Sequence, residues 1–152
     1  METPQPSTQL DRAIELVNQY VESIGLTQAQ VFNPELKNWR WTYGGASIEV
    51  FFEVAGSRTY LRIFSLLMEL PAFDQTRALR YLLELNDVKL GVKISLMANS
   101  PKVYATYERD IRGMDYPELS TCVADMEYWA STLKKELNEM FPPSGGGAIR
   151  PS

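Results

Sequence analysis

The sequence WRWTYGGASIEVFF, residues 39–52, contains the pattern that decides the fold. Large aromatic side chains stand at every second position of its first half, namely Trp39, Trp41 and Tyr43. Such alternation is typical of a β-strand, because successive side chains point to opposite faces of a sheet. Gly44-Gly45 can supply the positive φ angles of a two-residue hairpin turn, and a second alternating run follows it. We therefore predict an antiparallel hairpin with strands at 38–43 and from 46 onward.

Three more strands are predicted outside this hairpin. The segment TYLRIFSLLMEL, residues 59–70, is apolar on both faces. That pattern is typical of a strand that is covered on both sides or that enters a partner interface. Residues 91–98 and 102–111 form a strand–turn–strand pattern around an Asn-Ser-Pro turn.

Three amphipathic helices complete the pattern. Residues 8–24 carry apolar side chains at steps of three and four positions. Residues 72–86 form the second helix, with Asp74 as its predicted N-cap. The last helix begins at Asp115, whose spacing to Glu118 predicts a capping box.

The resulting order of elements is α-β-β-β-α-β-β-α. Runs of strands between helices indicate an α+β domain with an antiparallel sheet and helices packed on it. The stretch between the first helix and the first strand has no clear period and is expected to be a loop or an irregular strand. The length of 152 residues fits one domain. We predict a flexible tail at 1–7, a single α+β domain at 8–142 and a flexible tail at 143–152.

The last helix carries an apolar seam whose members step alternately by four and three positions. They are Leu119, Val123, Met126, Ala130, Leu133, Leu137 and Met140. This spacing fits one helix packed on a sheet, and it also fits a coiled-coil pairing with another chain. The pattern alone leaves both interpretations open.

The second helix is apolar over most of its circumference, so we expect it to be buried on more than one side. In so short a domain, the second side can be another subunit. The candidate dimer-interface residues are Leu79, Tyr81, Leu82 and Leu85.

Composition excludes several kinds of partner. The formal net charge is −4, which argues against nucleic acid or an anionic membrane as the main partner. No apolar run approaches the length of a membrane span, and the polar start METPQPSTQL lacks the apolar core of a secretory signal. The single cysteine, Cys122, agrees with a reducing compartment, and we expect the cytoplasm.

The sequence lacks the residues of the common catalytic sites. It has no histidine, which excludes Ser-His and Cys-His pairs and every histidine-ligated metal site. One cysteine cannot form a cysteine-rich zinc site, and no phosphate-binding loop is found. The nearest acidic group, Glu108, Asp110 and Asp115, reads as solvated charge at a strand end. We therefore expect no catalytic residue, no metal, no cofactor and no enzyme activity.

The order of elements resembles the type III secretion chaperone-like fold, and in particular the YbjN-like family. The features that carry the resemblance are LLELND (82–87), the strand pair in 88–111 and the long helix LSTCVADMEYWASTLKKELNEM (119–140). The segments ERDIRGMDYPEL (108–119) and YWASTLKKEL (128–137) are also similar to the cyanobacterial and plastid branch of these proteins. One member of that branch is a carboxysome assembly chaperone that binds the tail of a shell protein.

The resemblance implies a homodimeric, ATP-independent chaperone or assembly factor that holds an extended segment of a client protein. The client segment is then a peptide or tail, and a carboxysome shell protein is the implied example. The candidate client-binding residues are Trp39, Arg40, Trp41, Tyr43, Phe51 and Tyr60. For Trp39 and Trp41, packing in the core or between subunits is the alternative. A regulatory adaptor domain and a small-molecule-binding protein are the alternative functions.

Overall fold

The computed structural model of the protein describes residues 6–88 and 91–143. Its elements follow in this order: α1 (Pro6–Ser23), α2 (Gln28–Val31), β1 (Phe32–Asn33), β2 (Asn38–Tyr43), β3 (Ala46–Ala55), β4 (Arg58–Glu69), α3 (Gln75–Val88), β5 (Lys93–Leu96), β6 (Lys102–Asp110) and α4 (Tyr116–Met140). The predicted order is confirmed. Two short elements, α2 and β1, are added between the first helix and the first predicted strand, where the sequence shows no clear apolar period. The predicted tails fall mostly outside the described residues, although α1 begins at Pro6 and Pro143 is described.

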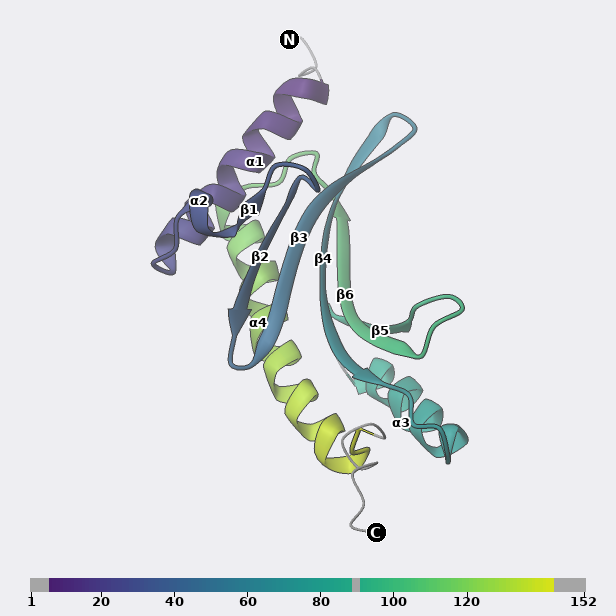
Figure 1. The fold of residues 1–152 in the computed structure, drawn as a ribbon. Helices are drawn as coiled ribbons and strands as arrows, with labels where there is room; N and C mark the ends of the chain where they lie inside the picture. The colour runs from purple at the N-terminus through teal and green to yellow at the C-terminus, as the bar shows by residue number, and fades with distance from the viewer. Residues whose placement is uncertain (1–5, 89–90, 144–152) are drawn as a thin grey trace.

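The strands form one six-stranded antiparallel sheet in the order β1-β2-β3-β4-β6-β5 (Figure 1). The predicted hairpin is present, since Tyr43 pairs with Ala46 and both Gly44 and Gly45 have positive φ. Strand β6 lies between β4 and β5, so the last two strands extend the sheet on the side of β4. The predicted α+β class is therefore confirmed.

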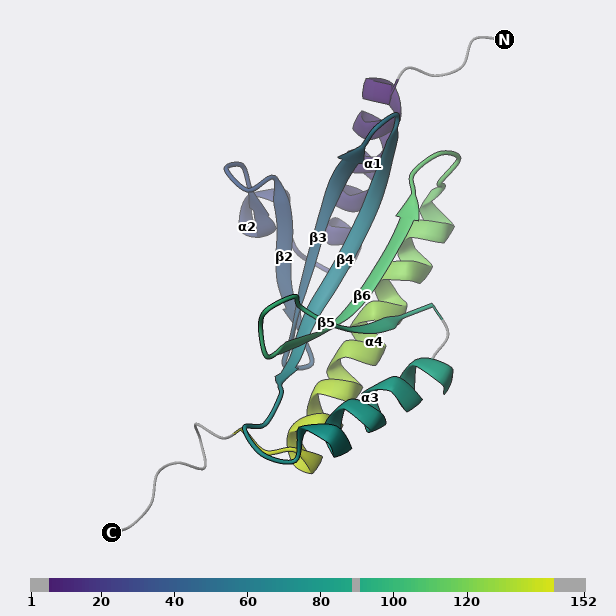
Figure 2. The same cartoon turned by 90° about the vertical axis from the view of Figure 1, so that its right-hand side faces the viewer.

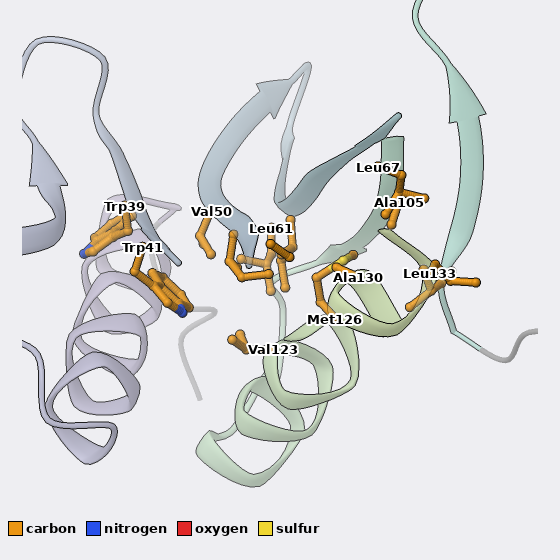
Figure 3. Close-up of a cluster of buried hydrophobic side chains, with 14 of the residues drawn as sticks. Trp39, Trp41, Val50, Leu61, Leu67, Ala105, Val123, Met126, Ala130 and Leu133 are labelled. Carbon is orange, nitrogen blue, oxygen red and sulfur yellow. The ribbon is translucent and has the colours of Figure 1, made fainter. Parts of the chain in front are cut away.

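Helices α1 and α4 lie on the same face of the sheet, which we call the inner face (Figure 2). Helix α4 packs against β3, β4 and β6, and α1 packs against α4 and β4. The seam of α4 is buried from Leu119 to Leu137, among side chains of the sheet such as Val50 and Leu61 (Figure 3). The structure therefore shows the first of the two interpretations of this seam, in which one helix packs on the sheet of its own chain.

The two predicted helix starts have different outcomes. At α4 the capping box is present, because Asp115 Oδ1 accepts from the Glu118 amide at 2.8 Å and Glu118 accepts from the Asp115 amide at 3.1 Å. At α3, Asp74 directly precedes the first helical residue as predicted, and its carbonyl accepts from the Ala78 amide at 3.4 Å, but it does not have the geometry of a side-chain cap. Asp74 has a φ of 64°, whereas an N-cap residue is extended, and its carboxylate instead accepts from Arg77 at 2.6 Å.

A buried carboxylate joins three elements of the inner face. Glu127 of α4 accepts one hydrogen bond from the Tyr20 hydroxyl of α1 and another, at 3.0 Å, from Trp41 Nε1 of β2. Glu127 is only 4% exposed. Burial and the hydrogen bond to Glu127 raise the pKa of Tyr20, so the phenol stays a donor. The carboxylate therefore fixes α1 and β2 against one position of α4.

We expect Glu127→Leu to destabilise the protein strongly, because it leaves the Tyr20 hydroxyl and the Trp41 indole without an acceptor. Each unpaired buried donor costs about 1–3 kcal/mol, so the summed loss is about 3 kcal/mol or more. Glu127→Gln keeps an acceptor and is expected to lose less. Urea unfolding of both variants measures the difference. Glu139→Leu, at an exposed position of the same helix, is the control. An equal loss in the Glu127→Leu and Glu139→Leu variants would contradict the role given to Glu127.

Candidate functional site

The face of the sheet opposite to α1 and α4, which we call the outer face, is not covered by any helix of the described chain (Figure 2). Three rings from three neighbouring strands meet on it: Phe51 of β3, Phe64 of β4 and Tyr104 of β6. The ring centroids of Phe51 and Phe64 are 5.4 Å apart, and those of Phe64 and Tyr104 are 5.6 Å apart. Both pairs are edge-to-face, the arrangement that aromatic rings favour. We call these three residues the aromatic strip.

The register of the strands explains why these rings meet. Phe64 lies opposite Glu49 on β3 and opposite Thr106 on β6. Phe51 lies two positions after Glu49 on β3 and Tyr104 lies two positions before Thr106 on β6, so each ring reaches Phe64 diagonally. A hollow of about 210 Å³ lies over the strip, with Ser95, Met97 and Thr106 on its β5–β6 side. Met97 is 47% exposed, so an apolar floor faces solvent here.

Charged side chains around the strip neutralise one another. Arg62 lies over the Phe51 ring at 5.8 Å and pairs with Glu53 at 2.7 Å and Glu108 at 3.5 Å. Glu108 also pairs with Lys93 at 3.0 Å, and this partner holds the pKa of the Glu108 carboxyl below its usual value. The outer face thus offers an apolar floor with a rim of paired charges, which suits a segment that brings apolar side chains and few charges.

The structure divides the predicted client-binding residues between the two faces. Phe51, Tyr60 and the exposed Arg40 lie on the outer face, where Arg40 Nε donates to the Ser47 hydroxyl at 3.0 Å. Trp39 and Trp41 point to the inner face and are 2% and 5% exposed. Tyr43 shares their side of β2 at its exposed end. The outer face therefore brings together only part of the predicted set.

Trp39 and Trp41 have the partners of core residues (Figure 3). Trp39 contacts the rings of Phe32 and Phe52 and donates from Nε1 to the Asn18 side chain at 2.9 Å. Trp41 donates to Glu127. Core packing was the stated alternative for both residues. We do not carry them forward as client contacts, because a ligand cannot reach them without opening the domain.

Two members of the aromatic strip, Phe64 and Tyr104, were not predicted from the sequence. The signal for Phe64 was present, since its segment is apolar on both faces. Tyr104 was not predicted because it alternates with Val103 and Ala105, whose apolar side chains are buried on the inner face. The alternation identifies both sets of side chains in β6 but does not say which set faces a partner.

The predicted dimer-interface residues also fall on two sides of α3. Leu82 and Leu85 are buried within the chain, whereas Leu79 is 37% exposed. Tyr81 packs against Phe141 and donates to Glu136 of α4, and this hydrogen bond is the main reason that the pKa of Tyr81 rises to about 12. The outward side of α3 is instead marked by Leu83, which is 71% exposed.

The acidic residues near the end of β6 have structural partners. Asp110 pairs with Arg112 at 3.0 Å, and the Arg112 amide is the first cause of the lowered pKa of its carboxyl. Asp115 caps α4. Within residues 6–88 and 91–143, no group of three His, Cys, Asp or Glu side chains could hold a metal ion. No helix in this part of the chain is long and apolar enough to cross a membrane.

No protein-family model and no curated protein matches this sequence. Among solved structures, the fold is similar to a chain of the ExsC–ExsE complex, with a TM-score of 0.61 and 10% identity over 88% of this chain and 96% of that chain. It is similar to a chain of the HopA1–SchA chaperone–effector complex, with a TM-score of 0.62 and 14% identity over 87% and 99%. It is also similar to YbjN of E. coli, with a TM-score of 0.57 and 14% identity over 84% and 92%. The protein therefore has the fold of the type III secretion chaperones and of YbjN.

Because both tryptophans belong to the core, we expect Trp39→Ala and Trp41→Ala each to cost about 3–5 kcal/mol of unfolding free energy. Chemical unfolding followed by circular dichroism measures the loss. Tyr43→Ala is the matched control, because Tyr43 ends the same strand but is half exposed. A Trp39→Ala variant as stable as the Tyr43→Ala variant would show that the ring does not support the core.

Proposed function

We propose that the protein is a non-enzymatic client-binding protein, a dimeric and ATP-independent chaperone or assembly factor. The observation that carries this proposal is the aromatic strip of Phe51, Phe64 and Tyr104 on a sheet face that no described helix covers. In this proposal an apolar segment of the client lies over the strip.

The physical argument rests on what the strip offers and what surrounds it. An aromatic side chain contributes about 150–250 Å² when it becomes buried, and aromatic residues dominate the energy of many interfaces. The rings are held by neighbouring strands of one sheet, so little order has to be gained on binding. The rim charges are already paired, and a client segment does not have to neutralise them. This surface supports binding and requires no catalytic group.

Similar folds in complexes support a client as the partner. One of the similar structures is a complex of HopA1 with SchA, described as a chaperone–effector complex. Another is the type III secretion chaperone SycH of Yersinia pestis in complex with a fragment of YscM2, with a TM-score of 0.54 and 16% identity over 78% and 97%. The resemblance of residues 108–119 and 128–137 to the cyanobacterial and plastid branch supports the tail of a carboxysome shell protein as the client. The single cysteine supports a cytoplasmic location for this activity.

The client surface is tested with Phe64→Ser and Phe51→Ser, measured by calorimetry against a synthetic peptide of a carboxysome shell-protein tail. We expect each variant to bind about tenfold more weakly or worse, because an aromatic anchor is lost. Tyr128→Ser, at an exposed aromatic residue of α4, is the control and is expected to bind normally. Melting curves establish that the variants are folded. If the folded variants bind as the parent does, the strip is not the client surface.

The dimer in this proposal uses the outward side of α3. Leu79 and Leu83 lie one helical turn apart, and the exposed Phe73 and Val88 flank the helix at its two ends. Exposed apolar side chains gathered on one helix mark an interaction surface.

Light scattering at tens of micromolar is expected to give the mass of a dimer, and Leu83→Asp is expected to reduce it to that of a folded monomer. Leu82→Asp is unsuitable for this test, because Leu82 is buried within the chain and its loss would unfold the domain. Leu36→Asp, at an exposed leucine outside α3, is the matched control. A parent protein that is monomeric, or a Leu83→Asp variant that stays dimeric, would remove this interface from the proposal.

A further inference from the structure

The side chain of Asn86, in the last turn of α3, covers part of an open edge of the sheet. Strand β5 is the last strand on its side, so its edge away from β6 has no strand partner among the described residues. Asn86 Oδ1 accepts from the Ile94 amide of β5 at 2.6 Å, and Asn86 Nδ2 donates to the Ile94 carbonyl at 3.0 Å. One side-chain amide thus makes the two hydrogen bonds that an adjoining antiparallel strand would make with this residue.

These two bonds also define which backbone groups of β5 face the open edge. The amide and carbonyl of Ile94 point away from β6, toward Asn86. Because such groups alternate along an antiparallel strand, those of Ser95 point to β6 and those of Leu96 point again to the open edge. Met97 continues the alternation, since its amide donates to the Lys102 carbonyl of β6 at 2.9 Å. Ile94 and Leu96 are therefore the positions of β5 at which a further strand would bond, and Asn86 occupies the first of them.

The side chains of β5 give this edge little other protection. Natural sheets protect their edges with charged side chains, with proline or with very short strands. Strand β5 contains no proline, and its one charged side chain, Lys93, is held by Glu108 at 3.0 Å. Leu96 is uncharged and 46% exposed. Without Asn86, the edge would offer a second extended chain two adjacent bonding positions and no free charge.

The surroundings of this edge fit a second copy of the chain. Leu79, Leu83 and Asn86 are spaced by four and three positions, so they lie along one side of α3. Figures 1 and 2 both place α3 beside β5, and the two elements are in contact. The exposed leucines of α3 and Leu96 of β5 therefore flank the same edge. A two-fold axis through this region would set β5 of one copy antiparallel to β5 of the other, which is the geometry of strand addition.

We propose that Asn86 is an edge-blocking residue, which prevents a second copy of the chain from pairing with β5 through its backbone. An incoming strand must break the two hydrogen bonds of Asn86 before it forms two with Ile94, so it gains no hydrogen bonds at this position. Contact between copies in this region is then limited to side chains. The inference goes beyond the proposed function and does not depend on it, because Asn86 blocks the edge in a monomer and in a dimer alike.

The proposal is tested by light scattering of Asn86→Ala over a range of protein concentrations. We expect this variant to reach at least twice the mass of the parent protein, because the edge at Ile94 is open. Leu96→Pro removes a donor that points away from β6, so adding it to Asn86→Ala is expected to restore the parent mass. Glu84→Ala, at an exposed position of the same helix, is the control and is expected to keep the parent mass.

Asn86→Asp separates an open edge from a loss of stability. It keeps an acceptor for the Ile94 amide but loses the donor to the Ile94 carbonyl, so it is expected to melt at a lower temperature than the parent. Its negative charge repels a like edge, so it is expected to keep the parent mass. Amide exchange in the unmodified protein supplies a measurement that needs no variant. We expect the Leu96 amide to exchange at least tenfold faster than the Ile94 amide at every protein concentration.

The proposal is overturned if folded Asn86→Ala keeps the parent mass at all concentrations. It is also overturned if Leu96→Pro does not reverse the larger mass, or if Asn86→Asp assembles as Asn86→Ala does, since lost stability would then explain the assembly. In the unmodified protein, a Leu96 amide as protected as that of Ile94 would show that the edge is already paired. None of these results bears on the outer face or on Leu83, which are judged by their own variants.

Discussion

The buried carboxylate of Glu127 is the contact on which the rest of the arrangement depends. It receives hydrogen bonds from Tyr20 of α1 and Trp41 of β2, and it lies among the apolar seam residues of α4. A buried carboxylate is costly unless its oxygens are satisfied, so these donors and the acceptor require one another. As a result, α1, α4 and the aromatic side of β2 gather on the inner face, and the two tryptophans become core residues.

Because α1 and α4 both cover the inner face, the outer face is formed by the strand side chains that alternate with the core residues. On β3, β4 and β6 these side chains include Phe51, Phe64 and Tyr104, which contact one another edge-to-face. The surrounding charges are held in pairs by Arg62, Glu108 and Lys93. The outer face is therefore apolar at its centre and electrically balanced at its rim. These properties support the proposal that a segment of another chain binds on this face.

The bend of β4 links this face to the other regions of interest. The strand follows β3 as far as Phe64 and then continues only with β6, with the register irregularity at Leu67. Such irregularities bend a strand and increase its twist. The bend leads β4 toward α3, whose outward leucines form the proposed dimer surface, and it separates β4 from β3. The cavity between the end of β4 and the end of α4 lies beside this bend.

The sequence by itself determined the order of the elements, the hairpin at Gly44-Gly45, the capping box at Asp115 and the apolar seam of α4. These features depend on local geometry, that is on the periods of two and 3.6 residues and on the hydrogen bonds of helix ends. Local signals were less reliable where two conformations compete, as at Asp74, whose left-handed backbone prevents the predicted cap.

Only the tertiary structure decided which side of each alternating strand is core. The alternation in residues 39–52 separates Trp39 and Trp41 from Arg40, but it does not say which set the helices will cover. For that reason the tryptophans could be taken for client contacts, while Phe64 and Tyr104 were not recognised beside Phe51. On α3 the same limit applied, because its apolar residues Leu82 and Leu83 are adjacent in sequence, yet Leu82 is buried and Leu83 is exposed. The choice depends on contacts between residues far apart in the chain, such as Tyr20 with Glu127, and these exist only once the domain has folded.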